Sequence, residues 1–86
     1  MEPIVREGLE AMLRKVNREI ARVEARLQAM AMGLGVSSWS ELERLFTGKG
    51  VDSPEIDLLL PEYLYLKERL QRLKERKKAA FKALED

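Results

Sequence analysis

Apolar residues recur every three or four positions in two long stretches of the chain, residues 9–34 and 56–84. The first stretch repeats at Leu9, Leu13, Val16, Ile20, Val23, Leu27, Met30 and Leu34. The second repeats at Ile56, Leu59, Tyr63, Leu66, Leu70, Leu73, Lys77, Ala80 and Leu84. A repeat of this kind keeps one narrow apolar seam on one side of a helix, which is the signature of a coiled coil.

Proline, glycine and serine mark the ends of these two helices. Pro3 suits a first helical turn, and a glycine of the Gly33-Leu34-Gly35 segment can take the left-handed conformation that ends a helix, which predicts a helix over 3–32. Ser53-Pro54 is a second start signal, and it predicts a helix over 54–84. Because the apolar spacing stays in phase across Pro61, we expect a kink near Pro61 rather than a break.

A short helix is predicted between the two long ones, over 39–46. Ser38-Trp39-Ser40-Glu41 reads as a capping box, in which the Ser38 hydroxyl accepts from the Glu41 N–H and the Glu41 carboxylate accepts from the Ser38 N–H. Gly48-Lys49-Gly50 is expected to stop this helix.

These elements predict an all-α fold, with residues 1–86 forming one domain. Two long helices joined by a compact tip form an antiparallel two-helix coiled-coil hairpin, with Met30 opposite Tyr63 and the short helix folded over the tip. We expect Trp39, Leu42 and Phe46 to cover apolar residues outside the seam: Leu58, Leu60, Leu64 or Tyr65. Several apolar residues stay without a partner in a lone hairpin: Val5, Met12, Leu60, Leu64 and Phe81. The hairpin is therefore expected to dimerise into a four-helix bundle, with a partner protein as the alternative.

Composition narrows the chemistry. The 86 residues include neither cysteine nor histidine, which removes thiolate chemistry, the commonest general base and the commonest metal ligand. We expect no catalytic residue, cofactor or metal. The all-helical chorismate mutases share the long–short–long helix order, but their arginine-isoleucine-aspartate opening is missing here.

No apolar run is long enough to span a bilayer, and no signal-peptide core is present, so a cytoplasmic location is expected. Abundant Glu, Arg, Lys and Leu, with little Asn, Gln or Thr, suit a thermophile.

Charge is distributed unevenly along the chain. Residues 31–66 carry two basic and six acidic groups, whereas residues 67–86 carry eight basic and four acidic groups. The basic-surface candidates are Arg14, Arg18, Arg22, Arg26, Arg72, Arg76 and Lys78. They allow a phosphate-binding stripe that would bind nucleic acid. The favoured interpretation is a solvated face tied by pairs such as Glu10–Arg14, Lys15–Glu19, Glu19–Arg22 and Glu68–Arg72.

Aromatic and leucine side chains gather near the predicted tip. The partner-binding candidates are Trp39, Phe46, Leu60, Leu64 and Tyr65, because aromatic side chains anchor interfaces. The favoured interpretation of the aromatics is that they form the core of the tip. Lys77 occupies a seam position, and we expect it to extend its ammonium group into water; the alternative is that it fixes the register or the oligomeric state.

Residues 35–70, GVSSWSELERLFTGKGVDSPEIDLLLPEYLYLKERL, resemble a group of short uncharacterised prokaryotic coiled-coil proteins, some of them proposed as antitoxins. The matching positions are Ser38, Glu41, Gly48, Asp52, Tyr63, Leu64, Leu66, Lys67 and Glu68. The resemblance implies a non-catalytic protein–protein interaction or oligomerisation protein that acts as the antitoxin-like partner of a small toxin. The alternative is a nucleic-acid-binding helical module that uses the basic open end of the hairpin.

Overall fold

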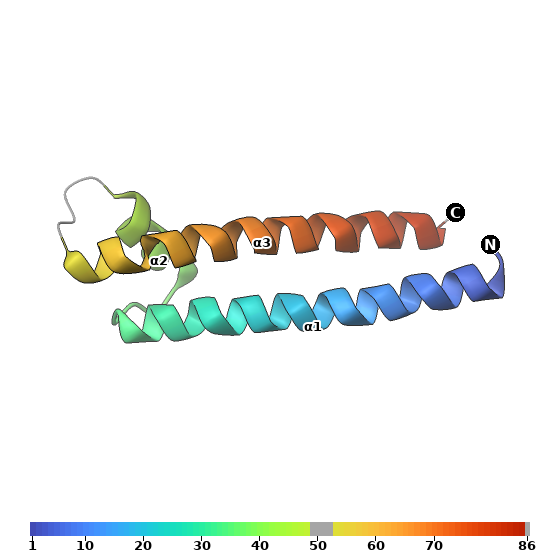
Figure 1. Cartoon of the computed structure of the whole chain (residues 1–86), viewed down its shortest axis with the longest axis horizontal. Helices are drawn as coiled ribbons and strands as arrows, with labels where there is room; N and C mark the ends of the chain where they lie inside the picture. Colours follow the sequence, from blue (N-terminus) through green and yellow to red (C-terminus); the bar gives the residue numbers. More distant parts are fainter. Residues whose placement is uncertain (49–52, 86) are drawn as a thin grey trace.

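The computed structural model describes residues 1–48 and 53–85, and it contains three helices: α1 (Pro3–Gly33), α2 (Trp39–Thr47) and α3 (Pro54–Glu85). The two long helices lie side by side and run in opposite directions, so the N- and C-terminal ends lie at the same end of the molecule (Figure 1). The molecule measures 55 × 20 × 19 Å along its principal axes. The predicted all-α hairpin is therefore found across the described part of the chain, and its dimerisation stays a prediction.

Glycine and local hydrogen bonds end α1. Gly35 has a φ of 75°, in the left-handed region that favours glycine. The Gly35 N–H donates to the Met32 carbonyl at 3.2 Å, and the Val36 N–H donates to the Ala31 carbonyl at 3.0 Å. This pair of bonds is a Schellman motif, which satisfies two carbonyls that the helix leaves free.

The predicted cap of α2 is present in modified form. The Ser38 hydroxyl accepts from the Glu41 N–H at 3.2 Å, as expected. The Glu41 carboxylate accepts from the N–H of Ser37, also at 3.2 Å, and not from that of Ser38. At the other end the Gly48 N–H donates to the Arg44 carbonyl at 2.7 Å. Lys49 and Gly50, the remaining residues of the predicted stop, lie outside the described residues.

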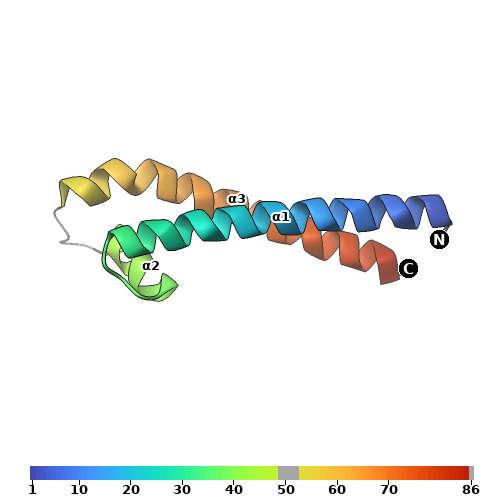
Figure 2. The same cartoon turned by 90° about the horizontal axis from the view of Figure 1, so that it is seen from below.

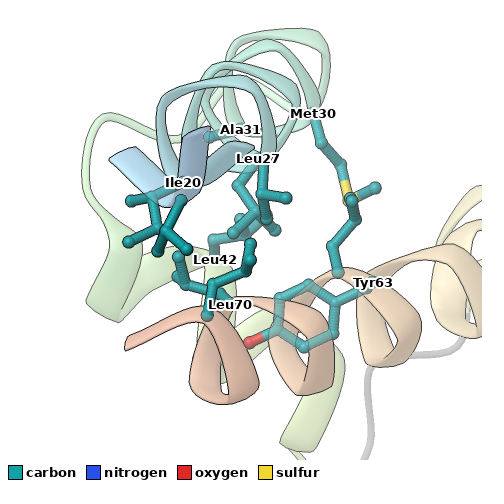
Figure 3. Close-up of a cluster of buried hydrophobic side chains, with 11 residues drawn as sticks. Ile20, Leu27, Met30, Ala31, Leu42, Tyr63 and Leu70 are labelled. Atoms are coloured by element: carbon teal, nitrogen blue, oxygen red, sulfur yellow. The ribbon is translucent and has the colours of Figure 1, made fainter. Parts of the chain in front are cut away.

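The apolar seam forms the core between α1 and α3. Its buried members are Leu13, Val16, Ile20, Val23, Leu27, Met30, Ile56, Tyr63, Leu66, Leu70, Leu73 and Ala80. Met30 points toward Tyr63 (Figure 3), as the antiparallel pairing predicts. The helix α3 continues through Pro61 as one element. Lys77, the polar member of the seam, is partly buried, and its Nζ lies 6.0 Å from the centre of the Phe81 ring.

Helix α2 packs against one side of the seam and covers only the part of the hairpin nearest the tip (Figure 2). Leu42 reaches in toward Leu27 and Leu70 (Figure 3) and is 2% exposed. The Phe46 ring stacks on Tyr63, with the ring centres 4.2 Å apart and the planes 11° from parallel. A short helix is stable here because its apolar side is buried by the hairpin.

The four residues named as alternatives for the cover of the tip differ in burial. Leu58, Leu64 and Tyr65 stay exposed, and Leu60 is the residue of that set that packs against the buried cluster. The reason is that α2 docks beside the seam, onto Tyr63 and Leu27, and leaves the outer side of α3 uncovered.

Candidate interaction surfaces

Two surfaces flank the seam, and they differ in chemistry. Gln28 and Lys67 bind α2, since Gln28 Oε1 accepts from Trp39 Nε1 at 3.4 Å and Lys67 Nζ donates to Glu43 at 2.8 Å. Arg26 lies two residues before Gln28 on α1, and Arg69 lies two residues after Lys67 on α3. Because residues two positions apart point to opposite sides of a helix, Arg26 and Arg69 lie on the face away from α2.

Salt bridges between the long helices define that second surface, which we call the bridge face. Arg26 binds Glu62 at 2.5 Å, and Arg69 binds Glu19 at 3.3 Å. One heptad back along α1, from Arg26 to Glu19, corresponds to one heptad forward along α3, from Glu62 to Arg69, as antiparallel helices require. The hydrogen bond and charge of Arg26 lower the pKa of Glu62, while Glu62 raises the pKa of Arg26.

The bridge face becomes apolar toward the open end of the hairpin. One further heptad along α1 leads from Glu19 to Met12, which is 40% exposed, and another heptad leads to the exposed Val5. The same step along α3 leads from Arg69 to the exposed Arg76. The open end of this face therefore combines exposed apolar side chains with a basic group.

On the side of the seam that carries α2, α3 has a row of residues seven positions apart: Leu60, Lys67, Lys74 and Phe81. Leu60 packs in the buried cluster, and Lys67 is bound by Glu43, whose pKa falls while that of Lys67 rises. Lys74 and Phe81 lie beyond the end of α2. The tip half of this row is thus covered and the other half is open.

The open half forms a shallow trough. Three adjoining hollows of about 250, 360 and 530 Å³ all include Lys74 in their walls. We call this surface the lysine trough and define it by Leu70, Lys74, Lys77, Lys78 and Phe81; Lys67, which Glu43 already binds, lies at its edge nearest α2. Phe81 is 48% exposed and supplies the apolar surface, whereas Leu70 is 7% exposed at the floor, and three lysines surround them.

The structure separates the partner-binding candidates at the tip. Phe46 and Leu60 pack against the buried cluster. Trp39 is the first residue of α2, and its indole N–H donates a hydrogen bond to Gln28. Leu64 and Tyr65 are 54% and 61% exposed on α3. Two of the five candidates are therefore packed, one lies at the edge of α2 and two are exposed.

The basic candidates also fall on different surfaces. Arg14, Arg18 and Arg22 are exposed on α1, and Arg76 and Lys78, two residues apart, lie on opposite sides of α3. Arg26 is bound to Glu62, and Arg72 is bound to Glu68 as predicted. Glu10 and Glu19 do not bind the partners predicted for them. Glu10 binds Arg6, and Glu19 binds Arg69 across the hairpin.

Sequence reasoning missed the lysine trough, although its signal was present. The seven-residue row that starts at Leu60 lies one position past the seam residue Leu59, so its members flank the seam along its whole length. The cross-helix role of Glu62 was missed for the same reason, because only the seam positions were followed.

No family model matches the chain, and neither curated proteins nor solved structures yield a match. The resemblance of residues 35–70 to proposed antitoxins therefore stays a prediction. Within residues 1–48 and 53–85, no helix has both the length and the apolar character needed to cross a bilayer. In the same part of the chain, histidine, cysteine and acidic side chains form no group of three or more that could hold a metal ion.

Proposed function

We propose that this chain is a non-catalytic protein-interaction protein that forms a homodimer and presents its helical surface to a protein partner. The supporting observation is its accessible surface of 6519 Å². A compact monomer of 9.9 kDa exposes about 5,200 Å². The difference, about 1,300 Å², exceeds the roughly 800 Å² that each partner of a standard interface buries.

The bridge face is the surface that we assign to the homodimer. It carries Met12 and Val5 at the open end, and it adjoins the exposed Tyr65 and Leu58 toward the tip. A two-fold axis across the middle of the hairpin would place the tip of one copy over the open end of the other. The acidic tip would then meet the basic end of its partner, which favours this orientation over the parallel one.

Light scattering on the purified protein tests the dimer. We expect a mass of twice 9.9 kDa, and we expect Met12→Glu to give the monomer because it places a charge in the apolar part of the interface. Ala11→Glu is the matched control, since it adds the same charge one residue away on the outer side of α1. A mass of 9.9 kDa for the wild-type protein up to millimolar concentration would refute the homodimer.

The resemblance at residues 35–70 suggests one specific form of this function, the antitoxin-like partner of a small toxin. The interaction would use exposed helical faces and no bond-making chemistry. Affinity capture of the chain from its native cells should then recover one small protein in stoichiometric amount. Recovery of the homodimer alone would contradict an obligate partner.

Nucleic-acid binding is the second candidate function. The observation that favours it is a row of three exposed arginines on α1, Arg14, Arg18 and Arg22, which form no ion pair within the described residues. Phosphate binding by such a row is strongly salt-dependent. Electrophoretic shift of a DNA or RNA duplex at low salt tests it, and the absence of a shift there would end this alternative.

A further inference from the structure

Helix α2 shows which kind of side chain this side of the seam accepts. It docks with one buried leucine, Leu42, and with the acid that follows it, Glu43. Leu42 enters the space beside Leu27 and Leu70 (Figure 3), while Glu43 binds Lys67 at the rim. The docking segment thus pairs an apolar residue with an acidic one that follows it directly. This pair binds one heptad of the surface, the one that contains Lys67 and Leu70.

The same surface continues past α2 without a cover. Lys74 repeats Lys67 one heptad further on, and Phe81, 48% exposed, follows after another heptad. Lys77, Lys78 and Lys82 lie beside them, with Glu85 at the far end of the hollow. Within the described residues, Lys74 and Lys78 form no ion pair.

We propose that the lysine trough binds an acidic amphipathic helix of a partner protein, placed in line with α2. This inference rests on the proposed role as an interaction protein and specifies the partner's chemistry. The bound helix places apolar residues against Phe81 and acidic residues on Lys74 and Lys78. Because the part that α2 leaves open, from Lys74 to Lys82, spans about 12 Å of helix, it accommodates about two turns of a bound helix.

Charge complementarity and geometry favour a separate partner over a second copy of the chain. The α2 helix of a second copy has its own Leu42 and Glu43 engaged inside its own hairpin, so it does not offer the docking pattern. A free acidic helix offers that pattern on one side and is attracted by Lys74, Lys77 and Lys78.

Two fluorescein-labelled synthetic peptides of 15 residues serve as probes. Both carry a leucine stripe at helical spacing; one has glutamate after each leucine and the other has glutamine there. Fluorescence anisotropy should show that the glutamate peptide binds the full chain more tightly than the glutamine peptide. The double variant Lys74→Glu/Lys78→Glu should weaken binding of the glutamate peptide by about tenfold or more, because two attractions become repulsions.

Arg18→Glu/Arg22→Glu is the matched control, with the same change of charge on exposed α1 positions away from the trough. We expect less than a twofold change in peptide affinity there. Circular dichroism of both variants checks that the fold is intact, and the exposed position of all four residues favours this. Equal affinity for the trough variant and the control, or no binding of the glutamate peptide at millimolar concentration, overturns the proposal.

Light scattering separates this proposal from the homodimer. Peptide binding by a monomeric chain supports the trough and refutes only the homodimer, whereas a dimer that binds neither peptide refutes only the trough. Loss of the dimer in the Lys74→Glu/Lys78→Glu variant would show a second copy in the trough and overturn the proposal. So would a DNA duplex that binds through Lys74 and Lys78 when the glutamate peptide does not bind.

Discussion

Leu42 is the residue that holds α2 to the hairpin, and Leu42→Ala should release α2 while the long helices stay folded. Leu42 is 2% exposed and is the buried residue of α2. Truncating a buried leucine costs about 2–5 kcal/mol. A loss of about 3 kcal/mol lowers the docking equilibrium by roughly 100- to 200-fold. With 9 residues, α2 is shorter than the roughly 12–15 residues that an isolated helix needs, so it should unfold when released.

Trp39, the single tryptophan of the chain, reports this release directly. Its indole N–H donates to Gln28 in the docked state. On release, its emission should shift to the red and acrylamide should quench it more strongly. Helical ellipticity should fall by only about an eighth, because α2 contributes 9 helical residues beside the 31 and 32 of α1 and α3.

Leu64→Ala is the matched control, since it makes the same chemical change at a position that is 54% exposed. It should leave Trp39 emission and quenching at wild-type values. If Leu42→Ala also leaves them unchanged, the docking role assigned to Leu42 is wrong. If Leu42→Ala instead abolishes most of the ellipticity, α2 does not dock as a separable unit and the assignment of its stability to local packing fails.

Three further predictions test other parts of the fold. Gly35→Ala should cost about 1–2 kcal/mol in urea unfolding because of its φ of 75°, whereas Gly33→Ala, in helical backbone with open space around it, should cost nothing. Arg26 lowers the pKa of Glu62 from its ordinary 4.5, so the stability from this pair is present above pH 4.5 and is lost as the pH falls through the lowered pKa. The Tm of Glu62→Gln should therefore lie below that of the wild type at neutral pH and approach it in acid; equal values at neutral pH would contradict this. Lys77→Leu should raise the Tm by a few degrees by completing the seam, and an unchanged Tm and oligomer mass would show that Lys77 neither weakens the seam nor sets the register.

The long helices and their ends could be predicted because their signals are local. The seam follows from the spacing of apolar residues alone, and a glycine such as Gly35 or a proline such as Pro54 marks a helix end by its own backbone preference. The Ser38 cap of α2 is equally local. In each case the deciding interaction lies within one helical turn of the residue that predicts it.

The side on which α2 docks could not be predicted from these local signals. Either side of a two-helix seam can accept an apolar helix, and the choice depends on residues far apart in the chain. On the chosen side Ala31 is buried and Leu60 is partly buried, whereas Arg26 and Glu62 occupy the other side. Comparing the two rows that flank the seam would have indicated the side, and the row through Leu60 would also have led to the lysine trough.

The salt bridges of the bridge face also bear on how the hairpin folds. A seam of leucines and valines is nearly the same after a shift of one heptad, so apolar packing alone discriminates weakly between alternative alignments of the two helices. The bridges reverse their sign from one heptad to the next, since Arg26 meets Glu62 and Glu19 meets Arg69. A shift in one direction would bring Arg26 against Arg69, and a shift in the other would bring Glu19 against Glu62. Each misaligned hairpin thus acquires a repulsion that the native one lacks, which disfavours such kinetic traps during folding.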